Sequence, residues 1–275
     1  MKRKRINKYI SNILCIAICI IAILPFMWMI STSLRLPVNS FNLPPSFFPD
    51  TFNIDNYVQV FKKVPLLLYI GNSFFVSIIA TILQCIITCL AAYAFSRMQF
   101  KGKSVLFLLL LSGLMIPVQS TVIPIFMLYK QLHLIDSRIG VILPLLINPL
   151  GIFIMKQFME SIPKSYDEAA KLDGANHLRI LFKVIMTMTK PAIVTVAVLS
   201  YVSSWNDFYR PLIFITSAEK MTLPLGMTAL SGLMRNSSIS IILAGIIVSS
   251  IPLILIYIFG QKYFVEGISL SGLKG

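Results

Sequence analysis

Six long apolar runs dominate this sequence and restrict the folds that it can adopt. Each of them approaches or exceeds the roughly 20 residues that an α-helix needs to cross the hydrocarbon core of a bilayer. The sequence therefore predicts an all-α membrane protein with six transmembrane helices. These predicted spans cover approximately residues 10–32, 69–95, 104–128, 139–158, 190–212 and 239–260.

The composition argues against a soluble protein. Of the 275 residues, 57% are hydrophobic and 12% are charged, whereas soluble domains have about 25% charged residues. An apolar excess of this size must face lipid. The formal net charge of +14 would suggest a nucleic-acid partner in a soluble protein. Because aromatic and basic residues do not alternate here, and basic loops in a membrane protein are topology signals, we expect no nucleic-acid binding.

The loops between the runs differ in their content of Lys and Arg, and the richer side is expected to be cytoplasmic. Two thirds of the 24 Lys and Arg residues lie in the N-terminal tail, in Arg97–Lys103, in Lys156–Lys190 and after the last run. Both termini are then cytoplasmic, and the segments Ser33–Leu68, Tyr129–Arg138 and Ile213–Ser238 are external. The first run is too long for a signal peptide and is interpreted as a retained anchor.

The polar stretch SYDEAAKLDGAN, residues 165–176, stands between apolar runs and predicts a short cytoplasmic helix over Tyr166–Asp173. Ser165 followed by Glu168 is a capping-box pattern, and acidic residues in the first turn suit the helix dipole. Gly174 is suited to the left-handed conformation that ends a helix.

So short a helix is not stable alone in water and needs a surface to pack against. Ala169 and Ala170 carry small side chains that allow a close approach, while Tyr166 and Leu172 offer larger anchors. Two surfaces remain open: that of another protein, and the cytoplasmic end of this chain itself.

Groups that carry chemistry are scarce. The residues 102–104, Gly-Lys-Ser, lack the earlier glycine that a phosphate-binding loop requires, and His133 and His177 have no neighbours at metal-ligand spacing. The cysteines lie inside apolar runs and are interpreted as small packing residues. They are Cys15, Cys19, Cys85 and Cys89. We therefore expect no catalytic residue, no metal site and no cofactor bound by this chain.

Polar residues inside the predicted spans are costly in lipid, and they mark either a solute pathway or a hydrogen bond between helices. The segment WNDFY, residues 205–209, puts aromatic rings beside polar groups, which is the combination that binds a sugar ring. The alternative for this segment is a set of aromatic residues at the membrane interface. The pathway candidates are Gln119, Asn148, Trp205, Asn206, Asp207 and Tyr209.

The segment EKMTLPLGMTALSG, residues 219–232, has an apolar core that the topology places outside the membrane. Exposed apolar residues in a loop suggest a protein partner, and a re-entrant cap on the spans is the alternative. The candidate contact residues are Leu223, Pro224, Leu225 and Gly226.

The chain resembles the ABC importer permeases of the carbohydrate-uptake branch. EAAKLDGA, residues 168–175, is similar to the Glu-Ala-Ala loop of that family, E-A-A-x-x-x-G with a later I-x-L-P. Thr187 replaces the proline of the later element and puts the bend after the loop in question, and Pro191 is a candidate to supply it. Further similar segments are NSFFVS (72–77), AAYAFSRMQFKGK (91–103), MIPVQSTVIPIFMLYKQLHLIDSRIGVILP (115–144), IFIMKQFMESIP (152–163) and SSWNDFYRPLIF (203–214).

The likeness covers nearly the whole chain and is nearest to the smaller permease subunit of maltose-type and glycerol-phosphate-type importers. It implies the transmembrane domain of a type I ABC importer, in which the Glu-Ala-Ala loop is a coupling helix that fits a groove in a cytoplasmic ATPase. The residues to which this role carries over are Tyr166, Asp167, Glu168, Ala169, Ala170, Leu172, Asp173 and Gly174. In the maltose-type family the loop that corresponds to Leu223–Gly226 reaches into the binding protein.

The resemblance also implies the partners. They are a second, homologous permease that completes a heterodimer, two copies of the ATPase, an extracytoplasmic solute-binding protein, membrane lipid and a sugar substrate. ATP would be bound by the ATPase subunits. In relatives the partner permease lines the sugar site, while the smaller subunit often contributes little to it.

We therefore expect a multi-pass, non-enzymatic permease subunit in a bacterial cell membrane that imports a sugar or oligosaccharide. The expected division is an N-terminal tail, first span and external loop at 1–68, a type-1 transmembrane domain at 69–262 with the coupling loop at 163–180, and a cytoplasmic tail at 263–275. Alternatives are a permease for a non-sugar solute such as glycerol phosphate, a secondary carrier with Asp207 as almost its only ion-coupling candidate, and a membrane scaffold or insertase.

Overall fold

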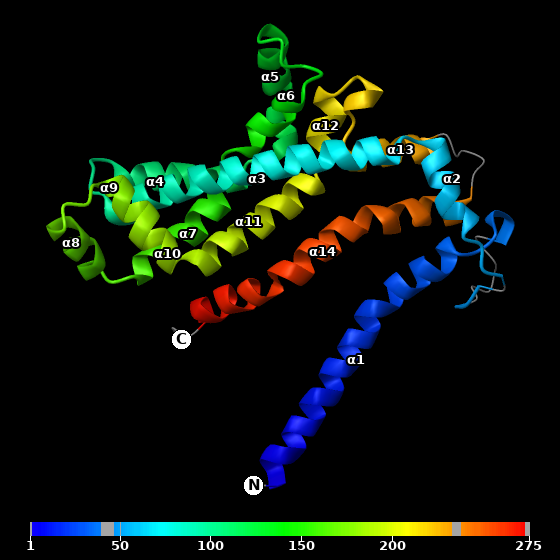
Figure 1. Ribbon diagram of the computed structural model, residues 1–275, viewed down its shortest axis with the longest axis horizontal. Helices are drawn as coiled ribbons and strands as arrows, with labels where there is room; N and C mark the ends of the chain where they lie inside the picture. The colour runs from blue at the N-terminus through cyan, green and yellow to red at the C-terminus, as the bar shows by residue number, and fades with distance from the viewer. Residues whose placement is uncertain (1, 40–46, 50, 233–237, 273–275) are drawn as a thin grey trace. The chain divides into compact units, whose positions relative to one another are not determined.

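The computed structural model describes residues 2–39, 47–49, 51–232 and 238–272, and every regular element in these ranges is helical (Figure 1). The predicted all-α class is confirmed. The chain forms two compact units, residues 1–67 with 226–251 and residues 68–225 with 252–275. The helices α13 (Leu223–Gly232) and α14 (Ile239–Gly272) run from one unit into the other.

The first unit begins with α1 (Lys2–Ser33), the first apolar run. Its part Ser11–Ser33 is long and apolar enough to cross a membrane, and most of its Ile and Leu side chains are exposed, as suits a helix surrounded by lipid. The amide of Asn56, in α2 (Asp55–Lys63), donates to the carbonyls of Ser33 and Arg35 at 2.7 Å each. The first bond satisfies a carbonyl that the end of α1 leaves unpaired, and the second holds the turn that follows α1.

Within the same unit, α14 packs closely against α13. A methyl group added to Gly245 would stand 2.7 Å from Cε of Met227 and 3.1 Å from Cδ2 of Leu230. Small residues at such crossings let membrane helices approach one another. The part Ile239–Phe259 of α14 is also long and apolar enough to cross a membrane.

The second unit contains most of the helices. In chain order they are α3 (Leu66–Arg97), α4 (Lys103–Ser112), α5 (Val118–Gln131), α6 (Arg138–Ile142), α7 (Pro149–Ser161), α8 (Ser165–Leu172), α9 (His177–Arg179), α10 (Met186–Met188), α11 (Lys190–Trp205) and α12 (Tyr209–Phe214). A π-helical turn, Ile180–Ile185, joins α9 to α10. Short 3-10 turns lie at Gly113–Met115, Leu143–Leu145 and Ala218–Lys220, with another in the first unit at Pro37–Asn39.

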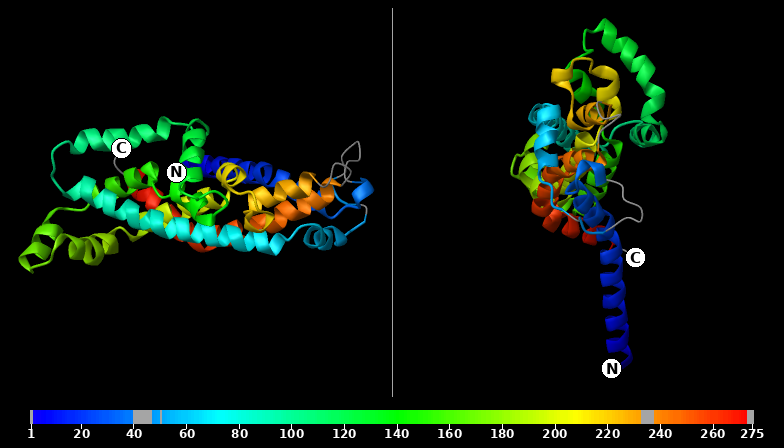
Figure 2. Two further views of the ribbon diagram at one scale, coloured as in Figure 1. Left: turned by 90° about the horizontal axis from the view of Figure 1, so that it is seen from above. Right: turned by 90° about the vertical axis from the view of Figure 1, so that its right-hand side faces the viewer.

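The predicted span over residues 104–128 consists of two helical segments with a sharp break between them. The helical segments Lys103–Met115 and Val118–Gln131 meet at 101°, and the change of direction between α4 and α5 is visible in Figures 1 and 2. Pro117 stands at this break. A proline cannot donate to the helix ladder and pushes the preceding residue toward extended backbone, which Ile116 adopts with φ −87° and ψ 113°.

Two more of the predicted spans are not single continuous helices. The run over 139–158 changes direction by 44° between Arg138–Leu145 and Pro149–Ser161. The run over 190–212 ends early, because α11 stops at Trp205. Among the described residues, three helices are long and apolar enough to cross a membrane, or up to six if each bent pair forms one span. The six-span count itself remains a prediction.

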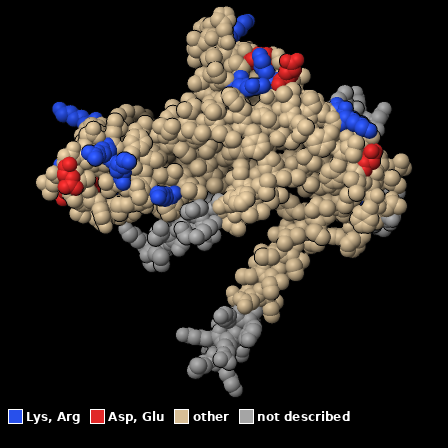
Figure 3. Space-filling view, viewed as in Figure 1, with Lys and Arg blue, Asp and Glu red and all other residues tan. Residues whose placement is uncertain are grey.

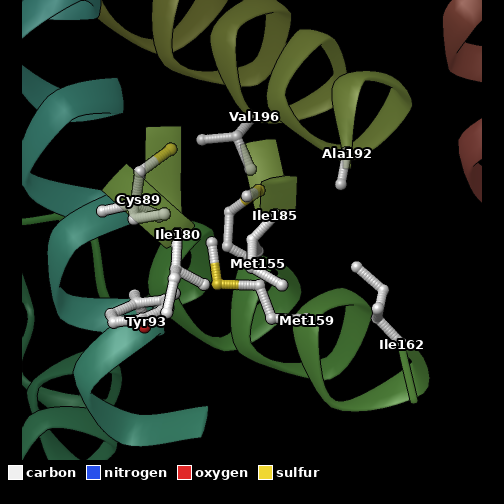
Figure 4. Close-up of a cluster of buried hydrophobic side chains, with 11 residues drawn as sticks. Cys89, Tyr93, Met155, Met159, Ile162, Ile180, Ile185, Ala192 and Val196 are labelled. Carbon is white, nitrogen blue, oxygen red and sulfur yellow. The ribbon is translucent and has the colours of Figure 1, made fainter. Parts of the chain in front are cut away.

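Two apolar clusters organise the second unit. One lies among α3, α7, the π-helical turn and α11, and it includes Tyr93, Met155, Met159, Ile180 and Ile185 (Figure 4). The other gathers side chains from α3, α5, α6, α12 and the start of α13.

Charged side chains of the second unit are confined to parts of its surface. On the face seen in Figure 3 they gather over α8 and α9 and again over α5 and α12, while the surface over α3 between them is uncharged. An uncharged surface of this kind suits contact with lipid.

Candidate functional site

The polar stretch predicted to form a short helix does so as α8, which lies at one end of α3 in Figure 1. The predicted capping box is wrong. Lys164 already has helical angles, φ −65° and ψ −18°, and no side chain caps the helix start. Because the chain begins to coil directly after Pro163, Ser165 is the first residue inside the helix, where its hydroxyl cannot serve as the N-cap, and Glu168 has no capping partner.

The end of α8 agrees with the prediction and is a Schellman motif. Gly174 has φ +79°. Its N–H donates to the carbonyl of Lys171 at 2.9 Å, and the N–H of Ala175 donates to the carbonyl of Ala170 at 2.9 Å. This pair of bonds defines the motif and places Gly174 at the position that requires a left-handed backbone. Asp173, predicted as the last helical residue, is the C-cap.

α8 has an inner and an outer side. Ala170 and Ala175 pack against the apolar cluster of Figure 4. Leu172 points away from it with 90% of its surface exposed, and Tyr166 is 49% exposed. Ala169, Glu168 and Lys171 are exposed as well. The helix therefore rests on its own chain through small residues and leaves its large apolar side chains uncovered.

A buried ion pair that the sequence did not suggest holds the first turn of α8. The Nε of Arg97 lies 3.5 Å from Oδ2 of Asp167, and their side chains are 5% and 10% exposed. Nη2 of Arg97 also donates to the carbonyl of Ile162 at 2.9 Å. Asp167 was expected to suit the helix dipole and to belong to the coupling residues, and no partner within this chain was expected for it. The only signals in the sequence were an arginine at the end of an apolar run and an acidic residue in the loop helix, and neither identifies the other as its partner.

The chain bends after the loop although Thr187 replaces the family proline. The segments His177–Met188 and Lys190–Trp205 meet at 86°. Thr189 lies at the break, with its hydroxyl donating to the carbonyl of Ile185 at 2.9 Å. Pro191 occupies the first turn of α11, where a proline fits without losing a helix bond. That Pro191 supplies the bend stays a prediction.

The polar pathway candidates in the first half of the unit lie in different settings. Gln119 is exposed in α5. Asn148 accepts from the N–H of Gly151 at 2.9 Å and so caps α7. Its amide donates to Oε1 of the buried Gln84 and to Oγ of Ser200, both at 3.3 Å. Asn148 therefore joins three helices through hydrogen bonds, which is the structural alternative considered for these residues.

The side chains of the segment WNDFY do not form one continuous exposed surface within this chain. Trp205 is 2% exposed and stacks on Tyr201, with ring centroids 5.7 Å apart. Its indole is therefore a core side chain. Asn206 is exposed at the end of α11, while Asp207 pairs with Arg210 at 3.1 Å. Tyr209 begins α12 and is partly buried.

The expectation that the apolar core of residues 219–232 is exposed is wrong. Leu223 is 1% exposed, Leu225 is 5% exposed, and Gly226 is buried as well. Pro224 is partly buried. The N–H of Leu223 donates to Oγ of Ser73 in α3 at 2.7 Å, and the side chain of Leu225 belongs to the second apolar cluster. The contact of these residues with a binding protein stays a prediction.

A second charged cluster, also missed in the sequence, lies beside α12. Oδ2 of Asp136 accepts from Nζ of Lys220 at 2.8 Å and from the hydroxyl of Ser217 at 2.6 Å. Oδ1 accepts from the N–H groups of Thr216 and Ser217. The hydrogen bond from Lys220, followed by those from Ser217, holds the pKa of Asp136 well below its usual range. Asp136 therefore ties the loop before α6 to the segment after α12 as a carboxylate.

Comparison with known proteins identifies the family. Residues 86–269 match the binding-protein-dependent transport system inner membrane component. The arabinooligosaccharides transport system permease protein AraQ of Halalkalibacterium halodurans is 33% identical, with 100% of both chains covered. The trehalose/maltose transport system permease protein MalG of Thermococcus litoralis is 29% identical over 100% of both chains.

A solved structure shares the fold. It is the crystal structure of a bacterial ABC transporter involved in the import of the acidic polysaccharide alginate, and one of its chains matches with a TM-score of 0.81 and 25% identity, covering 96% of this chain and 98% of that chain. The predicted resemblance to ABC importer permeases is thereby confirmed. So is the prediction that the chain is not an enzyme, because the family is a transport component. The chain belongs to the family of binding-protein-dependent transport system inner membrane components, the membrane subunits of ABC importers.

Proposed function

We propose that this protein is one of two homologous permease subunits of an ABC importer in a bacterial cell membrane. It forms half of the translocation pathway and is coupled to a cytoplasmic ATPase through the loop at 163–180. Six spans cross the membrane with both termini in the cytoplasm, each bent pair counting as one span.

The observation that carries the proposal is the exposed outer side of α8. A helix of eight residues is too short to be stable alone in water, and here it is fixed at both ends by its own chain. Its Leu172 is nevertheless 90% exposed and its Tyr166 49% exposed. An apolar pair on a polar loop suits a protein partner, and an ATPase groove is the partner that the family provides.

The coupling residues divide into two groups by their position. Leu172, Tyr166, Glu168 and the small Ala169 form the side that meets the ATPase. Asp167, Ala170, Asp173 and Gly174 hold the helix in the orientation that presents this side. Exposed charged groups around α8 add electrostatic complementarity, which favours a correct docking orientation.

The substrate class is proposed to be a sugar or oligosaccharide. The relatives named above transport arabinooligosaccharides and trehalose or maltose. Among the pathway candidates, Asn206 is exposed and Tyr209 is partly exposed, and they are proposed to face the pathway formed with the partner permease. Trp205 is proposed to support them by fixing the end of α11.

Reconstitution tests this function. The chain is co-expressed with its partner permease, ATPase and solute-binding protein, purified through a tag on this chain, and placed in proteoliposomes. We expect one copy of each permease with two ATPase subunits, and ATP-dependent uptake of labelled arabino- or malto-oligosaccharide that requires the binding protein. Uptake without ATPase and binding protein, driven by an ion gradient, would identify a secondary carrier instead.

A further inference from the structure

The end of α3 that carries Arg97 contacts both limbs of the Glu-Ala-Ala loop. On the limb that enters the loop, Arg97 donates to the carbonyl of Ile162 at 2.9 Å and lies 3.5 Å from Asp167. On the limb that leaves it, the hydroxyl of Tyr93, about one turn earlier in α3, lies 3.2 Å from Nδ1 of His177. α3 is not continuous with the loop in sequence, yet it is bonded to the loop on either side of α8.

The other end of α3 is bonded to the segment between α12 and α13. The amide of Asn72 donates to the carbonyls of Glu219 and Met221 at 2.8 and 2.9 Å. Oγ of Ser73 accepts from the N–H of Leu223 at 2.7 Å. Both side chains are buried, so these bonds are shielded from competition with water.

Between these two sets of bonds α3 is unbroken. It is one helix of 32 residues, and at 1.5 Å per residue the part from Asn72 to Arg97 is about 37 Å long. Three other spans of the second unit change direction, by 101°, 44° and 86°. A straight helix transmits a displacement along its axis, whereas a bent span absorbs part of it at the break.

Arg97 and Asp167 form an ion pair without a hydrogen bond between the two facing atoms. Nε of Arg97 and Oδ2 of Asp167 are buried, and neither has a hydrogen-bond partner. The two groups are thus held by charge at 3.5 Å without the hydrogen bond that a slightly closer approach would form. Moving α8 away from α3 would separate two buried charges, which is costly. A small movement of α8 toward α3 would complete the bond.

We propose that α3 links the position of the coupling helix to the loop Glu219–Leu223 on the opposite face, with Arg97 as the positioning residue at the ATPase end. This rests on the proposed function, since it takes α8 as the ATPase contact. When the ATPase shifts α8, Arg97 draws α3 with it, and Asn72 and Ser73 move the opposite loop. Signals from that loop reach α8 by the same route.

The variant that tests the link is Arg97→Gln, compared with Lys101→Gln as the matched control. Lys101 lies in the loop directly after the end of α3 and is exposed, so each variant removes one positive charge from the same basic segment. In proteoliposomes containing the full importer we measure substrate transported per ATP hydrolysed, normalised to assembled complex. Arg97→Gln is expected to lower this ratio by about 5- to 150-fold, the range of coupling between distinct sites. Lys101→Gln is expected to keep the wild-type ratio.

Normalisation to assembled complex separates coupling from stability. A merely structural role would lower the yield of complex and leave the ratio unchanged, and that result overturns the proposal. If Arg97→Gln does not assemble, Arg97→Lys decides. It keeps the charge beside Asp167 but not the guanidinium fork that also reaches Ile162. A lowered ratio in Arg97→Lys supports the proposal, and a wild-type ratio overturns it.

A double-mutant cycle shows whether Arg97 acts through Asp167. Asp167→Asn, Arg97→Gln and the double variant are compared by the same ratio. If the pair acts as one contact, the double variant is no worse than the more severe single variant, and additive losses overturn the pairing. If the wild-type chain fails to retain an ATPase, the proposed function itself is refuted. If the wild-type chain and Arg97→Gln transport the same amount of substrate per ATP hydrolysed, only the role of α3 is refuted.

Discussion

Replacing Gly174 gives a direct test of how the coupling loop is shaped. Gly174 has φ +79°, and a Cβ placed on it would meet no atom within 4 Å. Any loss on substitution therefore comes from the backbone conformation and not from a steric clash with neighbours. For an L-residue the left-handed conformation costs about 1–2 kcal/mol, and a β-branched residue is worse.

The magnitude follows from this cost. A penalty of about 1–2 kcal/mol changes the ratio of ordered to disordered loop by about 5- to 30-fold. Asn tolerates the left-handed region better than Ala, and Val tolerates it least. We therefore expect ATPase retention and transport to fall in the order Gly174, Gly174→Asn, Gly174→Ala, Gly174→Val.

The assay has two parts. ATPase bound per permease is determined after purification, and transport is measured in proteoliposomes. Hydrogen exchange of the N–H groups of Gly174 and Ala175, which close the Schellman motif, reports the loop itself. Membrane insertion is expected to be unchanged in all variants, because it depends on hydropathy and flanking charge. Full ATPase retention and normal transport in Gly174→Val would show that this turn does not set the docking geometry.

Three further predictions concern other parts of the chain. Asp136 has φ +55°. Asp136→Asn keeps the tolerance of this left-handed backbone but loses the ion pair with Lys220, so we expect faster hydrogen exchange after α12. In the native chain the lowered pKa of Asp136 means that its stabilisation is complete above the ordinary value of 3.8 and is lost progressively as pH falls below it. The protection of these amides, which is the slowing of exchange relative to the intrinsic rate at each pH, is expected to fall from pH 6 to pH 3, and unchanged protection contradicts this. Asn148→Ala removes the cap of α7 and a partner of the buried Gln84, which should cost about 1–3 kcal/mol and lower the unfolding temperature in detergent, with Asn148→Asp in between because it keeps the cap. Lys171→Cys, in a chain without the four native cysteines, should react with impermeant thiol reagents only from the cytoplasmic side, and labelling from outside would refute the topology.

Features that depend on a few adjacent residues could be predicted from the sequence. The turn that ends α8 needs a positive φ angle at residue 174, and glycine adopts that angle without cost. The long apolar runs predicted the all-α class, because an apolar run of about 20 residues has the length and composition of a helix that crosses a bilayer. The breaks were missed although Pro117 lies at one of them, since a proline in a membrane helix is compatible with both a kink and a full break.

Features that depend on residues distant in the chain could not be predicted. Arg97 and Asp167 pair across two helices, and nothing in either segment specifies the other. Trp205 shows the same limit, because the local sequence of an aromatic residue beside polar groups is the same whether the ring binds a sugar or packs in a core. Leu223 is buried and its N–H donates to Ser73, a residue 150 positions earlier that the sequence of residues 219–232 does not indicate.

The capping box failed for a local reason. The pattern Ser165-x-x-Glu168 forms a capping box only if Ser165 has extended backbone, and the chain after Pro163 is already coiled at Lys164. Register at a helix start depends on the residues before the cap as much as on the cap itself.

Site-specific photo-crosslinking from residue 172 tests the central claim most directly. Leu172 is the most exposed large side chain of α8, and Leu132, which is 55% exposed beyond the end of α5, provides a control position. In membranes that contain the assembled importer, a photoreactive residue at 172 is expected to crosslink to the ATPase subunit, and one at 132 is not. A crosslink from 172 to lipid or to this chain alone, with the ATPase present in the same complex, would contradict the assignment of α8 as the coupling helix.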